Sequence, residues 1–230
     1  MEVKMLEIRS ERGTTRPVLI LDGECQILVD TSIPLQADAV LLAAKAAGGD
    51  PEKLSKVILT HQDLDHMGSL KDILARFPKI EVLCHEDEAP YIRGDLPPVK
   101  LGALPKDHEL RLAYARRVVS VGRTLKDGER LGDCGGILVI HTPGHTPGHL
   151  CLYVEKARTL IAGDALNMQD GALTGPNPVY TQDMALACRS LQKLQALDIE
   201  RVLTFHGGEF RGDVRAALQA LAPSCLDAQG

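Results

Sequence analysis

Short apolar runs alternate with turn residues along most of the chain, and the spacing of apolar positions changes between strand-like and helix-like. A hairpin signal stands near the N-terminus, where Asp22-Gly23 separates two apolar runs. The pattern predicts strands at residues 5–8, 18–21, 26–29, 57–59, 80–84, 118–121, 136–141, 150–154, 159–161 and 202–205. It predicts helices at residues 38–47, 69–77, 107–117, 182–197 and 214–221. This mixture of strands and helices indicates the α/β class.

Residues 92–114 form the least regular part of the chain, because prolines and a glycine interrupt a leucine-bearing segment. Long irregular inserts often form lids or specificity walls. Five basic residues in and just after this insert either favour an anionic substrate or form a solvated face: Lys100, Lys106, Arg111, Arg116 and Arg117. No low-complexity linker divides the chain, so we expect one domain over residues 1–230.

The stretch KVILTHQDLDHMG, residues 56–68, carries a dense group of polar side chains directly after an apolar run. Five polar residues fall within six positions: His61, Gln62, Asp63, Asp65 and His66. A single His beside an Asp is more often a simple hydrogen-bonded pair. Two imidazoles and two carboxylates at this spacing, however, would repel one another or lie unsatisfied without a cation. The set therefore predicts a metal site at the end of this strand.

Three more metal-ligand residues follow apolar strands and precede turns. His145 lies between two Thr-Pro-Gly tripeptides, whose rigid backbone suits a loop that holds one imidazole still. Asp164 follows Gly163, and His206 follows the last predicted strand. Repetition of one arrangement extends the prediction from a motif to a site.

Other polar residues near strand ends receive weaker predictions. His149 is expected to support the site or to lie in the core, His141 is a second choice as ligand, and His85 is left aside. Asp30 is expected to form a local turn, with orientation of a metal ligand as the alternative.

Composition limits the kinds of partner that we expect the protein to bind. The net charge is −5 with both signs interspersed, and aromatic residues make up 3%, which argues against a nucleic-acid surface. A small-molecule substrate is therefore expected, whereas the oligomeric state stays open. The absence of an apolar N-terminal segment and of long apolar runs predicts a cytoplasmic protein without membrane attachment. The six cysteines are spread singly, and we expect reduced, buried thiols.

Taken together, the HxDxDH motif, the TPGHTPG loop, the Gly-Asp pair and the final strand-end histidine resemble the metallo-β-lactamase-fold hydrolase superfamily. The resemblance implies a four-layer αββα sandwich, with two mixed sheets flanked by helices and the site at one edge between the sheets. It also implies two metal positions. The first would be held by His61, Asp63 and His145, the second by Asp65, His66 and His206, and Asp164 would bridge them.

The resemblance implies a dinuclear metal-dependent hydrolase. We expect it to act on a small ester-like substrate (a lactone, thioester or phosphoester) through a metal-bridging hydroxide that Asp65 orients as the catalytic residue. Two divalent ions are expected, zinc first. Asp63 replaces the second histidine of the family motif, and its hard oxygen leaves iron or manganese as alternatives.

Two other functions stay open beside hydrolysis. They are a non-haem iron redox enzyme of the same fold and a non-catalytic metal-binding regulatory protein. β-Lactamase activity itself is not expected, because the chain looks intracellular.

Overall fold

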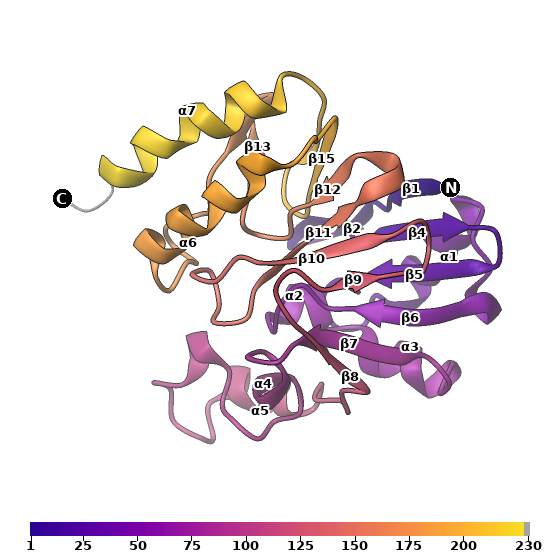
Figure 1. Cartoon of the computed structure of the whole chain (residues 1–230). Coiled ribbons are helices and arrows are strands. Elements are labelled where there is room, and N and C mark those ends of the chain that lie inside the picture. The colour runs from indigo at the N-terminus through magenta and orange to yellow at the C-terminus, as the bar shows by residue number, and fades with distance from the viewer. Residues whose placement is uncertain (228–230) are drawn as a thin grey trace.

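The computed structural model describes residues 1–227, with side chains described through residue 221. Its strands form two six-stranded sheets packed face to face (Figure 1). The first sheet contains, in spatial order, β1 (Glu2–Met5), β4 (Val18–Asp22), β5 (Cys25–Val29), β6 (Leu54–Ile58), β7 (Glu81–His85) and β8 (Arg123–Leu125). The strands from β5 to β8 are parallel and the others antiparallel, so the sheet is mixed.

The second sheet is also mixed. It contains β16 (Gly208–Phe210), β15 (Arg201–Thr204), β12 (Thr159–Ile161), β11 (Leu150–Val154), β10 (Ile137–His141) and β9 (Arg130–Leu131), in that spatial order. Within this sheet, β12 and β15 pair in parallel and the other neighbours are antiparallel. Two small hairpins complete the strands: β2 (Ile8–Ser10) with β3 (Gly13–Thr15), and β13 (Asn167–Gln169) with β14 (Ala172–Thr174).

Helices cover the outer face of each sheet. The α-helices are α1 (Ala37–Ala46), α2 (Leu64–Met67), α3 (Leu70–Arg76), α4 (Ala89–Ile92), α5 (Glu109–Ala115), α6 (Met184–Leu191) and α7 (Val214–Asp227). Short 3-10 turns are η1 (Pro51–Lys53), η2 (Val99–Leu101), η3 (Glu155–Ala157) and η4 (Gln192–Ala196). Helices α1 and α3 pack on the first sheet, and α6 and α7 on the second. The predicted four-layer αββα sandwich is therefore confirmed (Figure 1).

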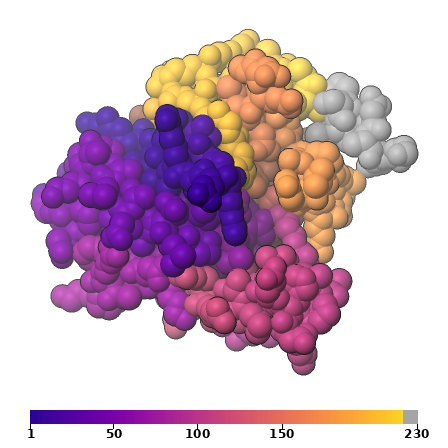
Figure 2. Space-filling view, turned by 180° about the vertical axis from the view of Figure 1, so that it is seen from behind, coloured from indigo at the N-terminus to yellow at the C-terminus, as the bar shows by residue number. Residues whose placement is uncertain are grey.

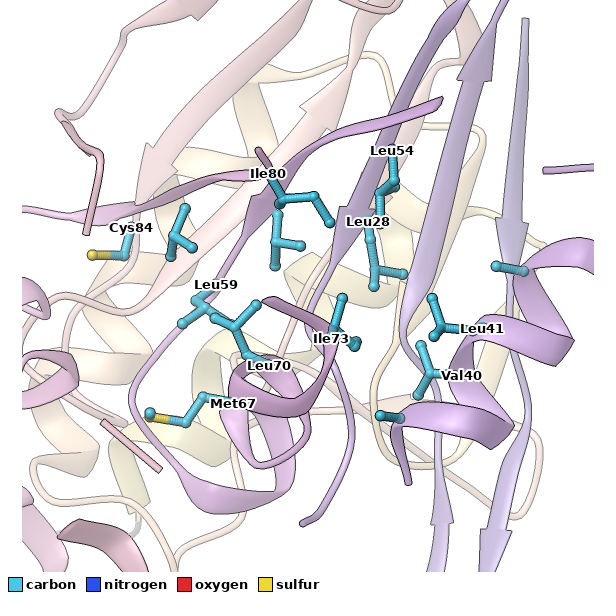
Figure 3. Packing of buried hydrophobic residues seen from close by; sticks show 14 of the residues in the cluster. Leu28, Val40, Leu41, Leu54, Leu59, Met67, Leu70, Ile73, Ile80 and Cys84 are labelled. Atoms are coloured by element: carbon cyan, nitrogen blue, oxygen red, sulfur yellow. The ribbon is translucent and has the colours of Figure 1, made fainter. Parts of the chain in front are cut away.

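The alternation of side chains along each strand creates three apolar layers. On β5, Ile27 and Val29 point between the two sheets, whereas Leu28 points outward into the layer under α1 and α3. Figure 3 shows this outer layer, where Leu28 lies near Val40 and Ile73 of the covering helices. Burying each such side chain stabilises the fold by about 1.5–3 kcal/mol. Packing on both faces therefore holds the strands that carry the site residues.

Three predicted elements need correction. The strand predicted at residues 5–8 is divided, because β1 ends at Met5 and β2 begins at Ile8. Residues 118–121 form no strand: their valines pack on the outer apolar layer, and Val119 N–H donates to the Ile92 carbonyl (3.1 Å). The helix predicted at residues 182–197 consists of the shorter α6 followed by η4.

The prediction of reduced cysteines is wrong for three of the described cysteines, because Cys25, Cys134 and Cys188 are disulfide-bonded. Cys25 at the start of β5 and Cys134 before β10 form a disulfide between the two sheets, 109 residues apart in sequence. No cysteine spacing in the sequence predicts this disulfide, because only the packing of the sheets brings the two residues together. Cys84 and Cys151 are free and buried, as expected, and burial raises the pKa of each thiol to about 12.

None of the helices among the described residues is both long and apolar enough to cross a membrane.

Candidate metal centre

The predicted ligand residues meet beside α2. Helix α2 lies at one edge of the sandwich (Figure 1). His61 follows β6, Asp164 follows β12, and His206 follows β15. The ring centroid of His61 lies 4.0 Å from that of His66 and 4.8 Å from that of His145. His206 lies 5.9 Å from His66 by the same measure. The structure therefore brings these side chains close together.

Two groups of three donor atoms can be distinguished at this edge. They are His61, His145 and Asp164, and Asp65, His66 and His206, and within each group all donor atoms lie within 4.8 Å of one another. Asp164 faces both groups, because its Oδ1 lies 3.3 Å from His66 Nε2 and its Oδ2 lies 3.4 Å from His145 Nε2. A carboxylate in this place can bridge two cations.

Asp63, the departure from the family motif, faces the first group. Its Oδ2 lies 3.2 Å from His61 Nε2 and 3.3 Å from His145 Nε2. The same oxygen accepts a hydrogen bond from the ammonium group of Lys100. Asp63 therefore lies beside the donors of the first group and is also paired with a cation of the protein itself.

Asp30 orients two of the histidines, so the alternative expected for it describes the structure better than a local turn. Its Oδ2 accepts hydrogen bonds from His66 Nδ1 and from Thr60 Oγ1, both at 2.8 Å. Because the Thr60 hydroxyl proton is used there, its oxygen accepts from His61 Nδ1 (3.1 Å). When neutral, both imidazoles thus carry their proton on Nδ1, which leaves Nε2 as the nitrogen that faces the site and can bind a cation.

A second set of contacts gives His145 the same tautomer. Thr181 Oγ1 donates to the Asn177 carbonyl (2.7 Å), so it accepts from His145 Nδ1 (3.2 Å). In His149, by contrast, both ring nitrogens form hydrogen bonds within the protein. Nε2 accepts from the Asp164 backbone N–H (3.0 Å), and Nδ1 donates to Thr142 Oγ1 (2.9 Å). His149 therefore positions Asp164 and has no lone pair left for a metal, in line with its predicted supporting role.

Gly163 makes this last contact possible. Its φ of +50° is one that residues with side chains seldom adopt, and a Cβ there would lie 2.7 Å from His149 Nε2. The Gly-Asp pair thus reflects the close approach of the Asp164 backbone to His149.

The donor set fits divalent cations. Among the described residues, His61 Nε2, His66 Nε2 and Asp164 Oδ1 are buried without a hydrogen-bond partner. Leaving such atoms unpaired costs about 1–3 kcal/mol each, more for charged groups. All three residues belong to the two donor groups, and imidazole nitrogen with carboxylate oxygen suits zinc as well as iron.

Electrostatic coupling across the site is strong. Burial and the neighbouring His66 lower the pKa of His61 to about 4. Burial acts to raise the pKa of Asp63 and of Asp164, yet the adjacent histidines outweigh it and hold both pKa values well below the usual range. Against burial, Asp164, Asp30 and Asp65 raise the pKa of His66 well above its usual value. The carboxylates are thus ionised near neutral pH and ready to bind cations.

Glu88, which the sequence did not single out, ties two site loops together. Its Oε2 accepts from the backbone N–H and the side-chain amide of Gln62 (2.9 and 3.0 Å), and its Oε1 accepts from the Gly148 N–H (2.7 Å). Burial raises the pKa of this carboxyl to about 7. In the sequence it stands in an acidic run, residues 86–88, that resembles an exposed helix start, so no local signal identified it.

A cavity of about 490 Å³ opens above the site. Asp63, Asp65, Asp164 and His206 form its floor. Its walls include Pro98, Lys100, Leu101 and Tyr114 from the irregular insert, and Asn167, Asn177 and Tyr180 from the facing side. In the view from behind, the pink insert and the orange part of the chain project on either side of a hollow (Figure 2). The insert therefore forms a wall of the site, as predicted.

A third group of metal-ligand residues is better explained by packing. Donor atoms of His85, Asp87 and His141 lie within 4.8 Å of one another. The two rings stack at 3.8 Å with an interplanar angle of 13°, so their in-plane lone pairs run parallel and cannot meet at one ion. His141 Nε2 also donates to the Pro147 carbonyl (2.9 Å). The stacked pair joins the ends of β7 and β10.

Comparison with known proteins agrees with this geometry. The family model described as the metallo-beta-lactamase superfamily matches residues 12–206, and the chain belongs to that superfamily. "Probable metallo-hydrolase YflN" of Bacillus subtilis (strain 168) is 32% identical over 214 residues, covering 85% of this chain and 81% of that protein. It is one relative among several of this kind.

Solved structures share the fold over nearly the whole chain. The metallo-beta-lactamase family protein TTHA1429 from Thermus thermophilus superposes with a TM-score of 0.75 at 25% identity, covering 98% of this chain and 79% of that one. TTHA1623, solved in a di-iron-bound form, has a TM-score of 0.68 at 22% identity, covering 95% and 98%. The second likeness concerns the fold alone.

Proposed function

We propose that this protein is a dinuclear metal-dependent hydrolase of a small ester-like substrate, a lactone, thioester or phosphoester. The observation that carries the proposal is the position of Asp164 between two donor groups. The three buried, unpartnered atoms of residues in these groups support it. Membership of a superfamily whose relatives include probable metallo-hydrolases agrees with it.

We assign His61, Asp63 and His145 to the first metal, Asp65, His66 and His206 to the second, and Asp164 to both. The assignment of His61, His66 and His145 rests on their tautomers, because each has its Nδ1 engaged and its Nε2 directed inward. Asp63 is included because its Oδ2 lies beside both histidines of the first group.

When bound by these residues, two divalent cations would lower the pKa of a water molecule and polarise the scissile carbonyl or phosphoryl oxygen. The residues of the chain do the rest. Asp65, on the cavity floor, accepts a hydrogen bond from the attacking water and aims it at the substrate. No serine or cysteine nucleophile is needed, and the free thiols of Cys84 and Cys151 are buried with pKa values of about 12.

The size and lining of the cavity favour a small substrate. A volume of about 490 Å³ lies within the range of about 300–1,000 Å³ that is usual for small-molecule pockets. Leu101 and the Tyr114 ring give one wall an apolar surface, and Asn167 and Asn177 add amide groups on the facing wall.

Zinc is the metal we propose first, with iron or manganese as alternatives because Asp63 adds a hard oxygen donor. Metal analysis of the purified protein distinguishes these, since open-site iron gives visible absorption or a paramagnetic signal and zinc gives neither.

The test is hydrolysis by metal-free protein before and after reloading with zinc, measured on an ester, a lactone, a thioester and a phosphodiester. We expect turnover of one of these classes only after reloading, and its loss in Asp65→Asn. Asp107→Asn, an exposed carboxylate in the insert, is the matched control. Full turnover without metal, or none on any of the four classes with two ions bound, would overturn the proposal.

A further inference from the structure

Lys100 is anchored to the same loop that carries His61 and Asp63. The backbone N–H of Val99 donates to Gln62 Oε1 (2.9 Å), and the Gln62 amide donates in turn to Glu88 (3.0 Å). This chain of buried and half-buried hydrogen bonds fixes the backbone of η2 against the metal motif. The backbone of Lys100 is therefore held beside the loop that carries His61 and Asp63.

The ammonium group of Lys100 lies among the donors of the first group. It donates to Asp63 Oδ2 and, at 2.8 Å, to His145 Nε2. His145 Nε2 carries the lone pair, because Nδ1 donates to Thr181. Two of the donors assigned to the first metal thus bind a cation that belongs to the protein.

The second donor group lacks such a cation. Over residues 1–221, no lysine or arginine forms an ion pair or hydrogen bond with the side chains of Asp65, His66, His206 or Asp164. Their side-chain polar contacts are with histidines, carboxylates and Thr60. The difference follows the sequence departure, because Asp63 adds a negative charge where the family motif has a neutral imidazole. Lys100 offsets that charge.

We propose that Lys100 is a built-in competitor for the first metal position. Its ammonium group occupies the space between Asp63 and His145, and a metal ion must displace it toward the cavity whose wall it lines. Like charges a few ångströms apart repel strongly in a partly buried site, so ammonium and metal exclude each other. The second position fills first, and the first fills only at higher metal concentration. This inference rests on the metal centre assigned under the proposed function.

The test is a titration of metal-free protein with Co²⁺, followed by calorimetry and by the visible spectrum of each bound ion. Lys100→Met removes the charge at similar length, Lys100→Arg keeps a cation, and Lys106→Met, an exposed lysine of the same insert, is the control. In the wild type and in Lys106→Met we expect one tight site and a second at least tenfold weaker. Lys100→Met should tighten the weaker site about tenfold or more and leave the tight one unchanged, and Lys100→Arg should resemble the wild type.

Two results would contradict the inference, and they differ in what else they affect. Two ions bound with the same affinities in the wild type and in Lys100→Met would overturn the role of Lys100 and leave the metal centre intact. Failure of any of the folded proteins to bind metal would overturn both this inference and the proposed function. Because binding is measured without substrate, absence of hydrolysis alone bears on the proposed function and not on Lys100.

Discussion

The two donor groups around Asp164 differ in what surrounds them. In the second group, His66 is held by the buried carboxylate of Asp30, which Thr60 fixes from the backbone and the side chain. In the first group, Asp63 and His145 share the ammonium group of Lys100, which comes from the irregular insert. Both groups have histidines that neighbouring side chains orient, but a cation of the protein lies among the donors of the first group alone. Two groups with the same number of donor atoms therefore differ in the charges that surround them.

The largest effect is expected for Asp164→Ala, because this carboxylate faces both groups. Hydrolysis should fall at least about 1,000-fold, since several kcal/mol of charge stabilisation depend on the cations it holds. Metal content after gel filtration should drop from two ions per chain to one or fewer. Asp107→Ala is the exposed control. Retention of two tightly bound ions in Asp164→Ala would remove the basis for a shared ligand.

Glu88 holds Gln62, which lies between His61 and Asp63 in the sequence. Its titration therefore tests whether the support of the first donor group depends on pH. Its pKa is about 7 in the folded protein against an ordinary value of 4.5, so the folded state binds more protons between these values. Its contribution to stability is full below about pH 4.5 and is lost as the pH rises toward 7. Burial of the ionised carboxylate is the cause.

Glu88→Gln should remove that slope, which amounts to roughly 2–3 kcal/mol over the window. Urea unfolding at about pH 5 and about pH 7.5, on either side of most of the titration, measures it, with the exposed neighbour Glu86→Gln as control. An identical pH dependence in wild type and Glu88→Gln would mean that Glu88 is ionised throughout.

Asp30→Asn should weaken metal binding at the second position about 10- to 100-fold, because the hydrogen bond that orients His66 loses its charge. Asparagine is chosen because Asp30 has a φ of 62°, which asparagine tolerates. Asp170→Asn, exposed and with a φ of 51°, matches it in backbone geometry. Equal affinities in these two variants would show that Asp30 does not support the site.

The smallest effect is expected for Asp63→His, which restores the family motif. A neutral imidazole should raise zinc preference over manganese at the first position by up to about tenfold and shift the acidic limb of the activity profile to lower pH. Titrations with both metals beside wild type measure this. Unchanged stoichiometry, preference and pH profile would mean that Asp63 is not a ligand.

The sequence predicted which residues meet at the candidate site, but not the contacts that distinguish the two donor groups. His61, His145, Asp164 and His206 were found because each follows an apolar strand, and the carboxyl ends of such strands share one edge. The sequence could not predict the histidine tautomers, because these depend on where Asp30 and Thr181 lie in space.

Non-local contacts explain the remaining omissions. Lys100 was predicted to be either solvated or substrate-binding, since nothing near it in sequence indicates Asp63 as its partner. Glu88 and Gln62 meet across 26 positions, and the Cys25–Cys134 disulfide spans 109. Each of these follows from packing between elements rather than from the pattern within one.

The most direct test of the central claim is diffraction from zinc-loaded crystals at the zinc absorption edge. A dinuclear centre shared by Asp164 predicts two anomalous peaks about 3.5–4 Å apart on either side of its carboxylate. A single peak, or zinc bound between His85 and His141 instead, would contradict a dinuclear centre built around Asp164.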